Sequence, residues 1–208
     1  RPAEIYRYLL DLGVTFHQYI PCVELDARGA LQPYSVDGAL WGDFLCGIFD
    51  EWRRGDVRRV SVRHFDSVLT MLVDGTPNVC HMGTDCRQYF VVEHNGDVYP
   101  CDFFVERDLR LGNIMSDEWE ALAASPVYRE FGEQKRRWNG ACDGCPHLRL
   151  CAGDCLKHRL YGNGDPSNIS LLCEGWKRFY GATMPAFEAL DDAEGKMVLT
   201  SINDKYTG

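Results

Sequence analysis

The cysteines of this chain are the residues whose type and spacing could do chemistry. Eight of the ten lie between Cys80 and Cys173, whereas Cys22 and Cys46 stand apart. Residues 142–155 read CDGCPHLRLCAGDC, so that a CxxC pair is followed closely by two further cysteines. A CxxC turn brings two thiolates onto one metal, in zinc and iron–sulfur sites alike. The clustered thiolates therefore predict two complete four-thiolate metal sites.

The spacing leaves the kind of metal and the partition of the ligands open. Zinc and iron–sulfur clusters both accept four thiolates in a tetrahedral array. A cysteine-rich zinc module used for protein interaction is one interpretation, and an iron–sulfur protein is another. The two cysteines outside the cluster, Cys22 and Cys46, are interpreted as ordinary buried thiols, because a free cysteine packs as a small hydrophobe.

Composition and charge exclude several other classes. The chain has 208 residues, of which 45% are hydrophobic and 25% charged, as in ordinary globular proteins. Its net charge of −9 disfavours nucleic-acid binding. No apolar run approaches the ~18 residues of a membrane span. No secretion signal is present at the N-terminus, which predicts a reducing, cytoplasmic setting where clustered thiols bind metals more often than they form disulfides.

The first part of the chain alternates between helix and strand. We expect helices over residues 2–12, 37–52 and 64–73, and strands over 15–22 and 57–62. Asp37 is predicted to cap the second helix, whose spacing gives it an apolar face of Leu40, Trp41, Phe44, Leu45, Ile48, Phe49 and Trp52. Such alternation predicts a parallel sheet with right-handed crossovers. Two or three of these units cannot close a barrel or cover their own sheet edge, so the unit is expected to be incomplete.

A second region begins near residues 75–78, where the composition changes to cysteine, glycine, proline and short apolar runs. Asn95-Gly96 between two apolar runs predicts a β-hairpin. Residues 117–131 are expected to form helical segments interrupted at Pro126. Residues 174–190 are expected to be helical, with a break near Pro185. We therefore predict two domains, 1–75 and 76–208.

The second region resembles the SPASM domain of radical S-adenosylmethionine enzymes. The resemblance rests on Cys86, the hairpin with Gly96, Cys101, the CxxC-x5-C-x3-C segment and Cys173. The additional Cys80, together with VYPCDFF and LGNI, resembles the anaerobic sulfatase-maturating enzymes in particular. IPC at 20–22 and RHFD at 63–66 resemble the end of that family's partial (β/α) barrel. The implied fold is α/β to α+β: the end of a partial barrel, then a loop-rich SPASM domain with a hairpin and two cluster sites.

The resemblance also implies the ligands and a catalytic residue. The family holds two auxiliary 4Fe–4S clusters, each with four cysteines. Carried over to this chain, the first would be held by Cys80, Cys86, Cys101 and Cys155, and the second by Cys142, Cys145, Cys151 and Cys173. Asp102 matches the family's proposed general base. A carboxylate is a weak base for a thiol unless desolvation raises its pKa, and Asp102 could instead cap the turn after the hairpin.

The radical-generating site of the superfamily does not match this sequence. That site uses CxxxCxxC, and the nearest string, CAGDCLKH at 151–158, has His158 in place of the third cysteine. The glycine-rich motif that binds the methionine end of the cofactor is also absent. The chain starts at Arg1 rather than Met. We therefore expect the C-terminal part of such an enzyme, inactive alone, with S-adenosylmethionine and a third 4Fe–4S cluster bound by a missing N-terminal part.

The function implied by the resemblance is the oxidation of a Cys or Ser in a sulfatase peptide to formylglycine. The visible part would bind the auxiliary clusters for electron transfer. The expected partners are a sulfatase-type peptide or nascent chain and a reduced electron carrier of the flavodoxin or ferredoxin type, with no nucleic acid and no membrane. A SPASM maturase of another peptide and the zinc-binding interaction module are the alternatives.

Overall fold

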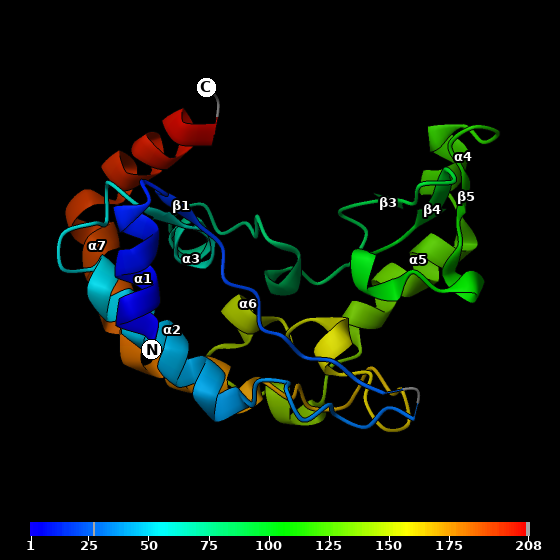
Figure 1. The fold of residues 1–208 in the computed structure, drawn as a ribbon, viewed down its shortest axis with the longest axis horizontal. Helices are drawn as coiled ribbons and strands as arrows, with labels where there is room; N and C mark the ends of the chain where they lie inside the picture. The colour runs from blue at the N-terminus through cyan, green and yellow to red at the C-terminus, as the bar shows by residue number, and fades with distance from the viewer. Residues whose placement is uncertain (27, 207–208) are drawn as a thin grey trace. The chain divides into compact units, whose positions relative to one another are not determined.

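The computed structural model describes residues 1–26 and 28–206, with side chains up to residue 190. Its secondary structure is mixed, mostly helical with two small sheets. The chain divides into two compact units, which Figure 1 shows by residue colour. The helical unit comprises residues 1–79 together with the chain from Leu171 onward, and the cysteine-rich unit comprises Cys80–Ser170.

The helical unit contains the predicted strand–helix–strand arrangement. Strands β1 (Phe16–His17) and β2 (Ser61–Val62) pair in parallel, and α2 (Gly38–Trp52) connects them. The flanking helices are α1 (Pro2–Asp11) and α3 (Arg63–Val73). The strands are much shorter than predicted because the backbone next to them makes hydrogen bonds outside the sheet. For example, a helical turn in which the Val60 N–H bonds to the Asp56 carbonyl at 2.8 Å leaves only Ser61 and Val62 extended.

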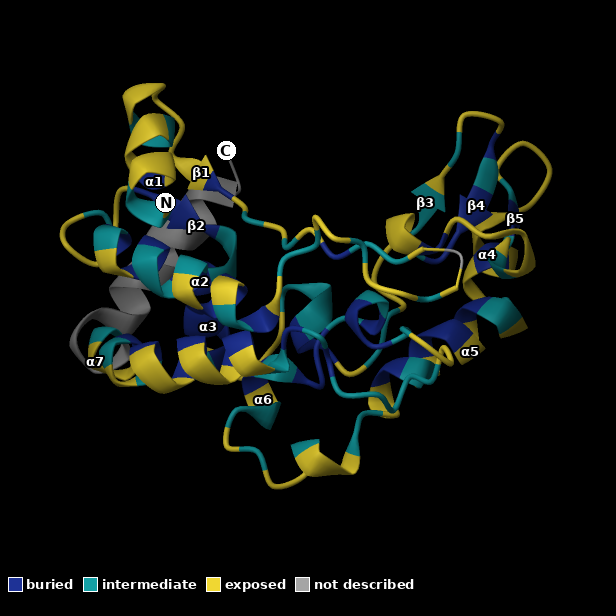
Figure 2. Ribbon diagram, turned by 60° about the horizontal axis from the view of Figure 1, so that its bottom comes forward, coloured by how far each residue is buried: buried dark blue, intermediate teal, exposed yellow. Residues whose placement is uncertain are grey.

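An aromatic core holds the helical unit together. Asp37 caps α2 as predicted, its Oδ1 accepting the Leu40 N–H at 2.8 Å. The aromatic face of α2 packs on α3 and α7 through ring contacts of 4.7–6.3 Å that Phe49 makes with Phe65, Phe179 and Phe187. Figure 2 shows β2 and much of α3 buried in this core. The predicted apolar face of α2 is thereby confirmed except at Leu40, which is exposed.

The last helix, α7 (Cys173–Tyr206), continues through Pro185, so the predicted break is wrong. A proline inside a helix costs ~3 kcal/mol because it removes a backbone hydrogen bond and crowds the preceding turn. Aromatic packing on both sides of the proline, by Phe179 and Phe187 against Phe49, offsets this cost. Among the described helices, α7 included, none is both long and apolar enough to cross a membrane.

The cysteine-rich unit is built from short elements around a confirmed β-hairpin. Strands β3 (Val91–Val92) and β4 (Asp97–Tyr99) pair antiparallel across the Asn95-Gly96 turn, and Gly96 adopts the positive φ of +85° that this turn needs. A third strand, β5 (Gly112–Asn113), pairs antiparallel with β4. The helices are α4 (Trp119–Ala123), α5 (Pro126–Glu133) and α6 (Leu148–Cys151). The predicted interruption at Pro126 is confirmed.

The C-terminal helix packs with α2 and α3 of the helical unit, whereas the sequence prediction placed it in the second domain. Glycines permit the close approach: a Cβ on Gly175 would lie 2.1 Å from the Gly38 carbonyl oxygen of α2. The helical unit therefore includes this helix, whereas the predicted first domain does not. The domain assignment 1–75 and 76–208 itself stays a prediction.

Candidate metal centre

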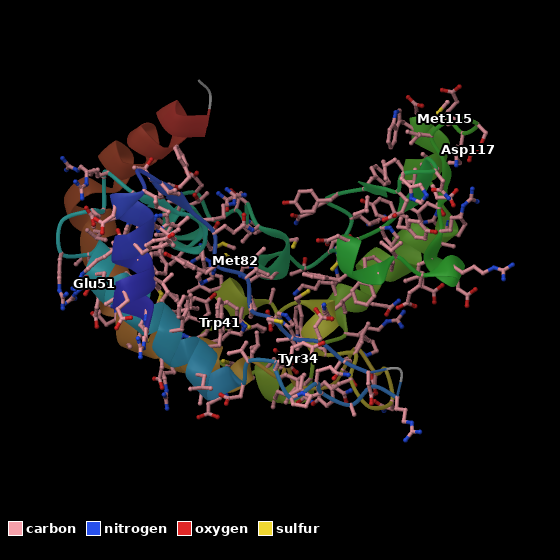
Figure 3. All side chains as sticks on the ribbon, in the orientation of Figure 1. Tyr34, Trp41, Glu51, Met82, Met115 and Asp117 are labelled. Atoms are coloured by element: carbon pink, nitrogen blue, oxygen red, sulfur yellow. The ribbon has the colours of Figure 1, made fainter. Side chains whose placement is uncertain are left out.

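Three cysteines of the cysteine-rich unit lie at the start of a short helical turn. Cys80 begins the turn Cys80–Met82, Cys101 immediately precedes Asp102–Phe104, and Cys155 immediately precedes Leu156–His158. The backbone N–H groups of Phe103 and Lys157 bond to the thiols of Cys101 and Cys155, two residues earlier. Such N–H···S bonds stabilise a thiolate and tune the potential of an iron–sulfur cluster. Met82, labelled in Figure 3, lies in the first of these turns and is buried.

The structure brings together Cys80, Cys86, Cys101 and Cys155, which we call the Cys80 group. The Cys80 thiol interacts electrostatically with each of the other three, and Cys86 interacts with Cys155. The backbone places Cys86 here through its N–H, which bonds to the Gly132 carbonyl at 3.3 Å. This is the same set of four that the family resemblance implies for one cluster. Its role as a ligand set stays a prediction.

An apolar shell surrounds part of the Cys80 group. Cys86 and Cys101 pack against the buried side chains of Phe104, Phe131 and Leu156. Burial is the main cause that raises the pKa of Cys86 to about 11 and that of Cys101 to about 12. Without metal, these thiols are therefore protonated at neutral pH, and binding a metal must displace their protons. Four grouped thiols, two of which pack against apolar side chains, fit an iron–sulfur cluster.

The compact segment holds three further cysteines in tight turns, which we call the CxxC group: Cys142, Cys145 and Cys151. The Cys145 N–H bonds to the Cys142 carbonyl at 2.9 Å, so the CxxC forms the expected turn. Cys151 is the last residue of α6. The eighth cysteine of the predicted ligand set, Cys173, is the first residue of α7 in the helical unit.

The segment between the two groups has an unusual backbone. Ala152, Gly153 and Asp154 have φ values of +46°, +72° and +65°, all in the left-handed region. This conformation costs an L-residue ~1–2 kcal/mol. The close neighbour of Gly153 is Trp138, whose Cβ would lie 2.7 Å from an added Cβ. The turn separates Cys151 from Cys155 and was not foreseen in the sequence, because Ala and Asp carry no strong signal for positive φ.

Charged side chains are buried beside this turn, another feature that sequence reasoning missed. The Asp154 carboxylate accepts hydrogen bonds from Ser170 Oγ at 2.5 Å and contacts His158 Nδ1 at 2.8 Å. Burial would raise the pKa of Asp154, but the attraction of His158 and these hydrogen bonds lower it overall. Lys135 Nζ donates to the Ala152 carbonyl at 2.5 Å. His158, in the position where a radical-site motif has cysteine, is therefore a partner of Asp154.

Asp102, the predicted base, is exposed beside the Cys80 group. Its Oδ1 lies 3.3 Å from the Cys101 Sγ, which donates the hydrogen bond. The capping residue of the turn Asp102–Phe104 is Cys101, and no side chain caps that turn. The interpretation of Asp102 as a cap is thus not supported, and its carboxylate lies on the surface next to the thiol.

No three Cys, His, Asp or Glu side chains in the described part of the chain converge as ligands of one metal ion. A single zinc ion draws its thiolates to ~2.3 Å from one centre. A 4Fe–4S cluster instead distributes its thiolates over separate irons, so its ligands stand farther apart. The absence of a single-ion site among the described residues is thus compatible with the grouping of the four thiols.

In the helical unit, the IPC segment lines a pocket of about 710 Å³ beside Tyr19, Trp41 and Phe44. The segment follows β1, and ligands of parallel α/β proteins bind at the carboxyl ends of the strands. Burial raises the pKa of Tyr19 to about 12, so its hydroxyl stays a hydrogen-bond donor. Cys22 of this segment is exposed, so its interpretation as a buried thiol is wrong, whereas Cys46 is half-buried.

A comparison with known protein families matches most of the cysteine-rich unit. Residues 80–146 match the SPASM family, an iron-sulfur cluster-binding domain. With the grouped thiols and the mixed fold, this match places the chain among SPASM-containing proteins of the radical SAM superfamily. Within that class, the chain corresponds to the C-terminal portion of the anaerobic sulfatase-maturating enzymes. The family resemblance read from the sequence is confirmed.

The relatives match nearly the whole chain. The serine-type anaerobic sulfatase-maturating enzyme of Bacteroides thetaiotaomicron is 34% identical over 202 residues, or 88% of this chain and 49% of that enzyme. The cysteine-type enzyme of Clostridium novyi is 31% identical over 180 residues, or 85% and 48%. The chain thus spans about half the length of the curated relatives it matches.

Solved structures agree with these relatives. Native anSMEcpe with bound AdoMet has a TM-score of 0.81 and 29% identity, covering 92% of this chain and 53% of that one. The same enzyme with AdoMet and the Kp18Cys peptide also has a TM-score of 0.81, covering 91% of this chain. The mixed fold of the chain therefore matches that of the corresponding part of a sulfatase-maturating enzyme.

Proposed function

We propose that this chain binds two auxiliary 4Fe–4S clusters in an enzyme that oxidises a Cys or Ser of a sulfatase-type peptide to formylglycine. The observation that carries the proposal is the grouping of the four thiols of the Cys80 group, three of which, Cys80, Cys86 and Cys101, lie in the segment 80–146 that matches an iron–sulfur domain. Both serine-type and cysteine-type enzymes are similar to the chain, so the proposal covers both substrates. When bound, an auxiliary cluster supplies a one-electron acceptor.

The Cys80 group would hold the first cluster. The CxxC group, completed by Cys173, would hold the second. Residues 1–75 would form the end of a partial (β/α) barrel and residues 76–208 the SPASM domain. The apolar shell of Phe104, Phe131 and Leu156 would keep water from the first cluster, and the N–H groups of Phe103 and Lys157 would stabilise its thiolates.

Asp102 would accept the proton that the substrate loses. Conversion of a Cys side chain to its thioaldehyde removes one hydrogen atom from the β-carbon, one proton from sulfur and one electron; water then replaces sulfur to give the aldehyde. S-adenosylmethionine bound in the N-terminal part would supply the radical chemistry that removes the hydrogen atom, and the Asp102 carboxylate would take the proton. The exposed position of Asp102 beside Cys101 leaves it accessible to a peptide and next to the proposed acceptor of the electron.

The remaining components would lie outside this chain. S-adenosylmethionine and a third 4Fe–4S cluster would bind to an N-terminal part, and a reduced flavodoxin- or ferredoxin-type carrier would deliver electrons. A sulfatase-type peptide as the substrate is supported by the anSMEcpe complex with the Kp18Cys peptide. The pocket that the IPC segment lines would form part of the peptide site, at the end of the partial barrel.

Iron and sulfide analysis of anaerobically reconstituted protein tests the proposal. Roughly eight irons and eight sulfides per chain are expected for two 4Fe–4S clusters. Stoichiometric zinc without sulfide would instead identify the zinc-binding interaction module. A preparation that binds neither metal under anaerobic conditions would also contradict the proposal.

A further inference from the structure

Two cations are buried in the cysteine-rich unit. The side chains of Lys135 and Arg159 are 0% and 1% exposed. Lys135 lies in the short turn Gln134–Arg136 that follows α5, and Arg159 directly follows the turn after Cys155. The two are joined, because the Arg159 guanidinium donates to the Lys135 carbonyl at 3.1 Å. Charged residues of these types are almost never fully buried unless their charge is compensated.

The hydrogen bonds of the two cations do not compensate their charge. Lys135 Nζ bonds to the Ala152 carbonyl at 2.5 Å, and Arg159 donates to the carbonyls of Pro166, at 2.9 Å, and Lys135. All of these acceptors are neutral. Within the described residues, neither cation forms an ion pair with a carboxylate. They therefore obtain hydrogen bonds but no contact with an anion.

Among the described residues, a buried carboxylate, that of Asp154, acts on both cations from a distance. Asp154 attracts both cations, while Lys135 and Arg159 repel each other. Burial and the nearby Arg159 lower the pKa of Lys135, and the Asp154 carboxylate already contacts His158, so the buried anion beside these two cations does not compensate both of them. A buried surplus of charge is costly, so a further anion is expected close by.

As thiolates, Cys86 and Cys155 of the Cys80 group attract both cations, and Cys142 of the CxxC group also attracts Arg159. Four thiolates around a 4Fe–4S core with a charge of +2 give a net charge of −2, and one added electron makes it −3. A cluster in the Cys80 group would thus supply the missing anion. A nearby fixed cation stabilises the more negative, reduced form more than the oxidised form.

We infer that Lys135 and Arg159 are the built-in counter-charges of the cluster held by the Cys80 group, and that the Lys135 ammonium raises the reduction potential of that cluster. The inference rests on the proposed function and adds to it a reason why this cluster accepts an electron readily. A purely structural alternative exists: Lys135 could serve only to hold the Ala152 turn through its hydrogen bond. The two roles differ in whether the charge matters.

Neutral variants of Lys135 separate these roles. In Lys135→Met the charge and the hydrogen bond are both lost, whereas Lys135→Gln keeps an N–H donor and Lys135→Arg keeps the charge. Arg137→Met is the matched control, because it removes an exposed cation two residues away. The full chain is reconstituted anaerobically, and the midpoint potentials of its clusters are measured by redox titration monitored by electron paramagnetic resonance.

In both neutral variants, the midpoint potential of one cluster should become more negative by ~59 mV. For a one-electron couple, this shift corresponds to about a tenfold change in the ratio of reduced to oxidised cluster. Lys135→Arg and Arg137→Met should keep the wild-type potentials. Unchanged potentials in the neutral variants would overturn the inference. If neither neutral variant holds the cluster, retention of iron by Lys135→Arg supports the charge requirement, and its loss there refutes it.

The same experiment distinguishes this inference from the function on which it rests. Wild-type protein without stoichiometric iron and sulfide would contradict the proposed function itself. Wild-type protein with both clusters, together with neutral Lys135 variants of unchanged potential, would contradict only the role of the buried cations.

Discussion

The Cys101 thiol donates a hydrogen bond to the carboxylate of its neighbour Asp102, with 3.3 Å between Sγ and Oδ1. A thiolate ligand has no proton to donate. Binding of metal by Cys101 would therefore release the Asp102 oxygen for another donor, such as the S–H or O–H of a substrate. The binding of metal by Cys101 would thus determine whether Asp102 is available as the proposed base.

Replacement of Asp102 by Asn in an active enzyme that contains this chain should reduce formylglycine by ~10²-fold or more, the usual contribution of a general base. Formation of 5′-deoxyadenosine and the iron content should persist, since Asn keeps the size of the side chain. The exposed Asp108→Asn serves as the control. Wild-type levels of both products in Asp102→Asn would leave Asp102 without a catalytic role.

Replacement of Cys86 by Ser should remove one of the two clusters, because a serine hydroxyl is a poor ligand for iron in this setting. Iron analysis should then give roughly four irons per chain in place of roughly eight. Cys22→Ser, in the helical unit, should keep the full complement. Equal iron contents in the two variants would contradict the assignment of Cys86 as a ligand.

The isolated chain should not cleave S-adenosylmethionine, because His158 stands where a radical-site motif needs its third cysteine. The measurement is 5′-deoxyadenosine released by the reduced, reconstituted chain, compared with a reaction without protein. Product above that background would show that the expectation of inactivity is wrong.

Replacement of Gly175 by Ala should destabilise the helical unit by about 1–3 kcal/mol, the typical cost of overpacking. The added methyl would meet the backbone of α2 at Gly38 and Gly42. Gly181→Ala on the same helix is the control: its Cβ would meet nothing within 4 Å, so it should stabilise by ~0.5–1 kcal/mol. Urea unfolding measures both, and a similar effect of the two substitutions would argue against the α2–α7 contact.

The hairpin should lose stability in acid through Asp97. Arg110 Nε donates to Asp97 Oδ1 at 2.6 Å, and this contact, helped by Asn113, lowers the pKa of Asp97 to about 2. Because the folded-state pKa lies below the unfolded value of ~3.9, the contribution is complete above about pH 4 and is lost as the pH falls through about 2. The difference in urea midpoint between wild type and Asp97→Asn should therefore be larger at pH 5 than at pH 2.5. A constant difference would exclude the carboxylate charge as its origin.

The sequence predicted the elements whose signals are local. The Asp37 cap, the apolar face of α2, the Asn95-Gly96 turn and the Pro126 interruption all depend on residues close together in the chain, and the structure confirms them. Strand lengths were overestimated because they depend on which backbone partners lie nearby. The continuity of α7 through Pro185 was missed because distant aromatic residues decide it.

The site was predictable in composition and only in part in arrangement. Cysteine spacing indicated metal but could not select the Cys80 group, since Cys86 and Cys155 are brought together by tertiary structure. The family resemblance supplied that partition. Lys135 and Arg159 could not be distinguished from surface residues in the sequence, because nothing local indicates that a lysine in a charged stretch is buried.

The helical unit is assembled from two separate stretches of chain, residues 1–79 and those from Leu171 onward, with the cysteine-rich unit between them. This connectivity sets an order of events during synthesis on the ribosome. Residues 80–170 emerge, and can take up metal, before the partner helix of α2 has been made. Stalled or truncated translation in this interval would leave the aromatic face of α2 without the helix that covers it.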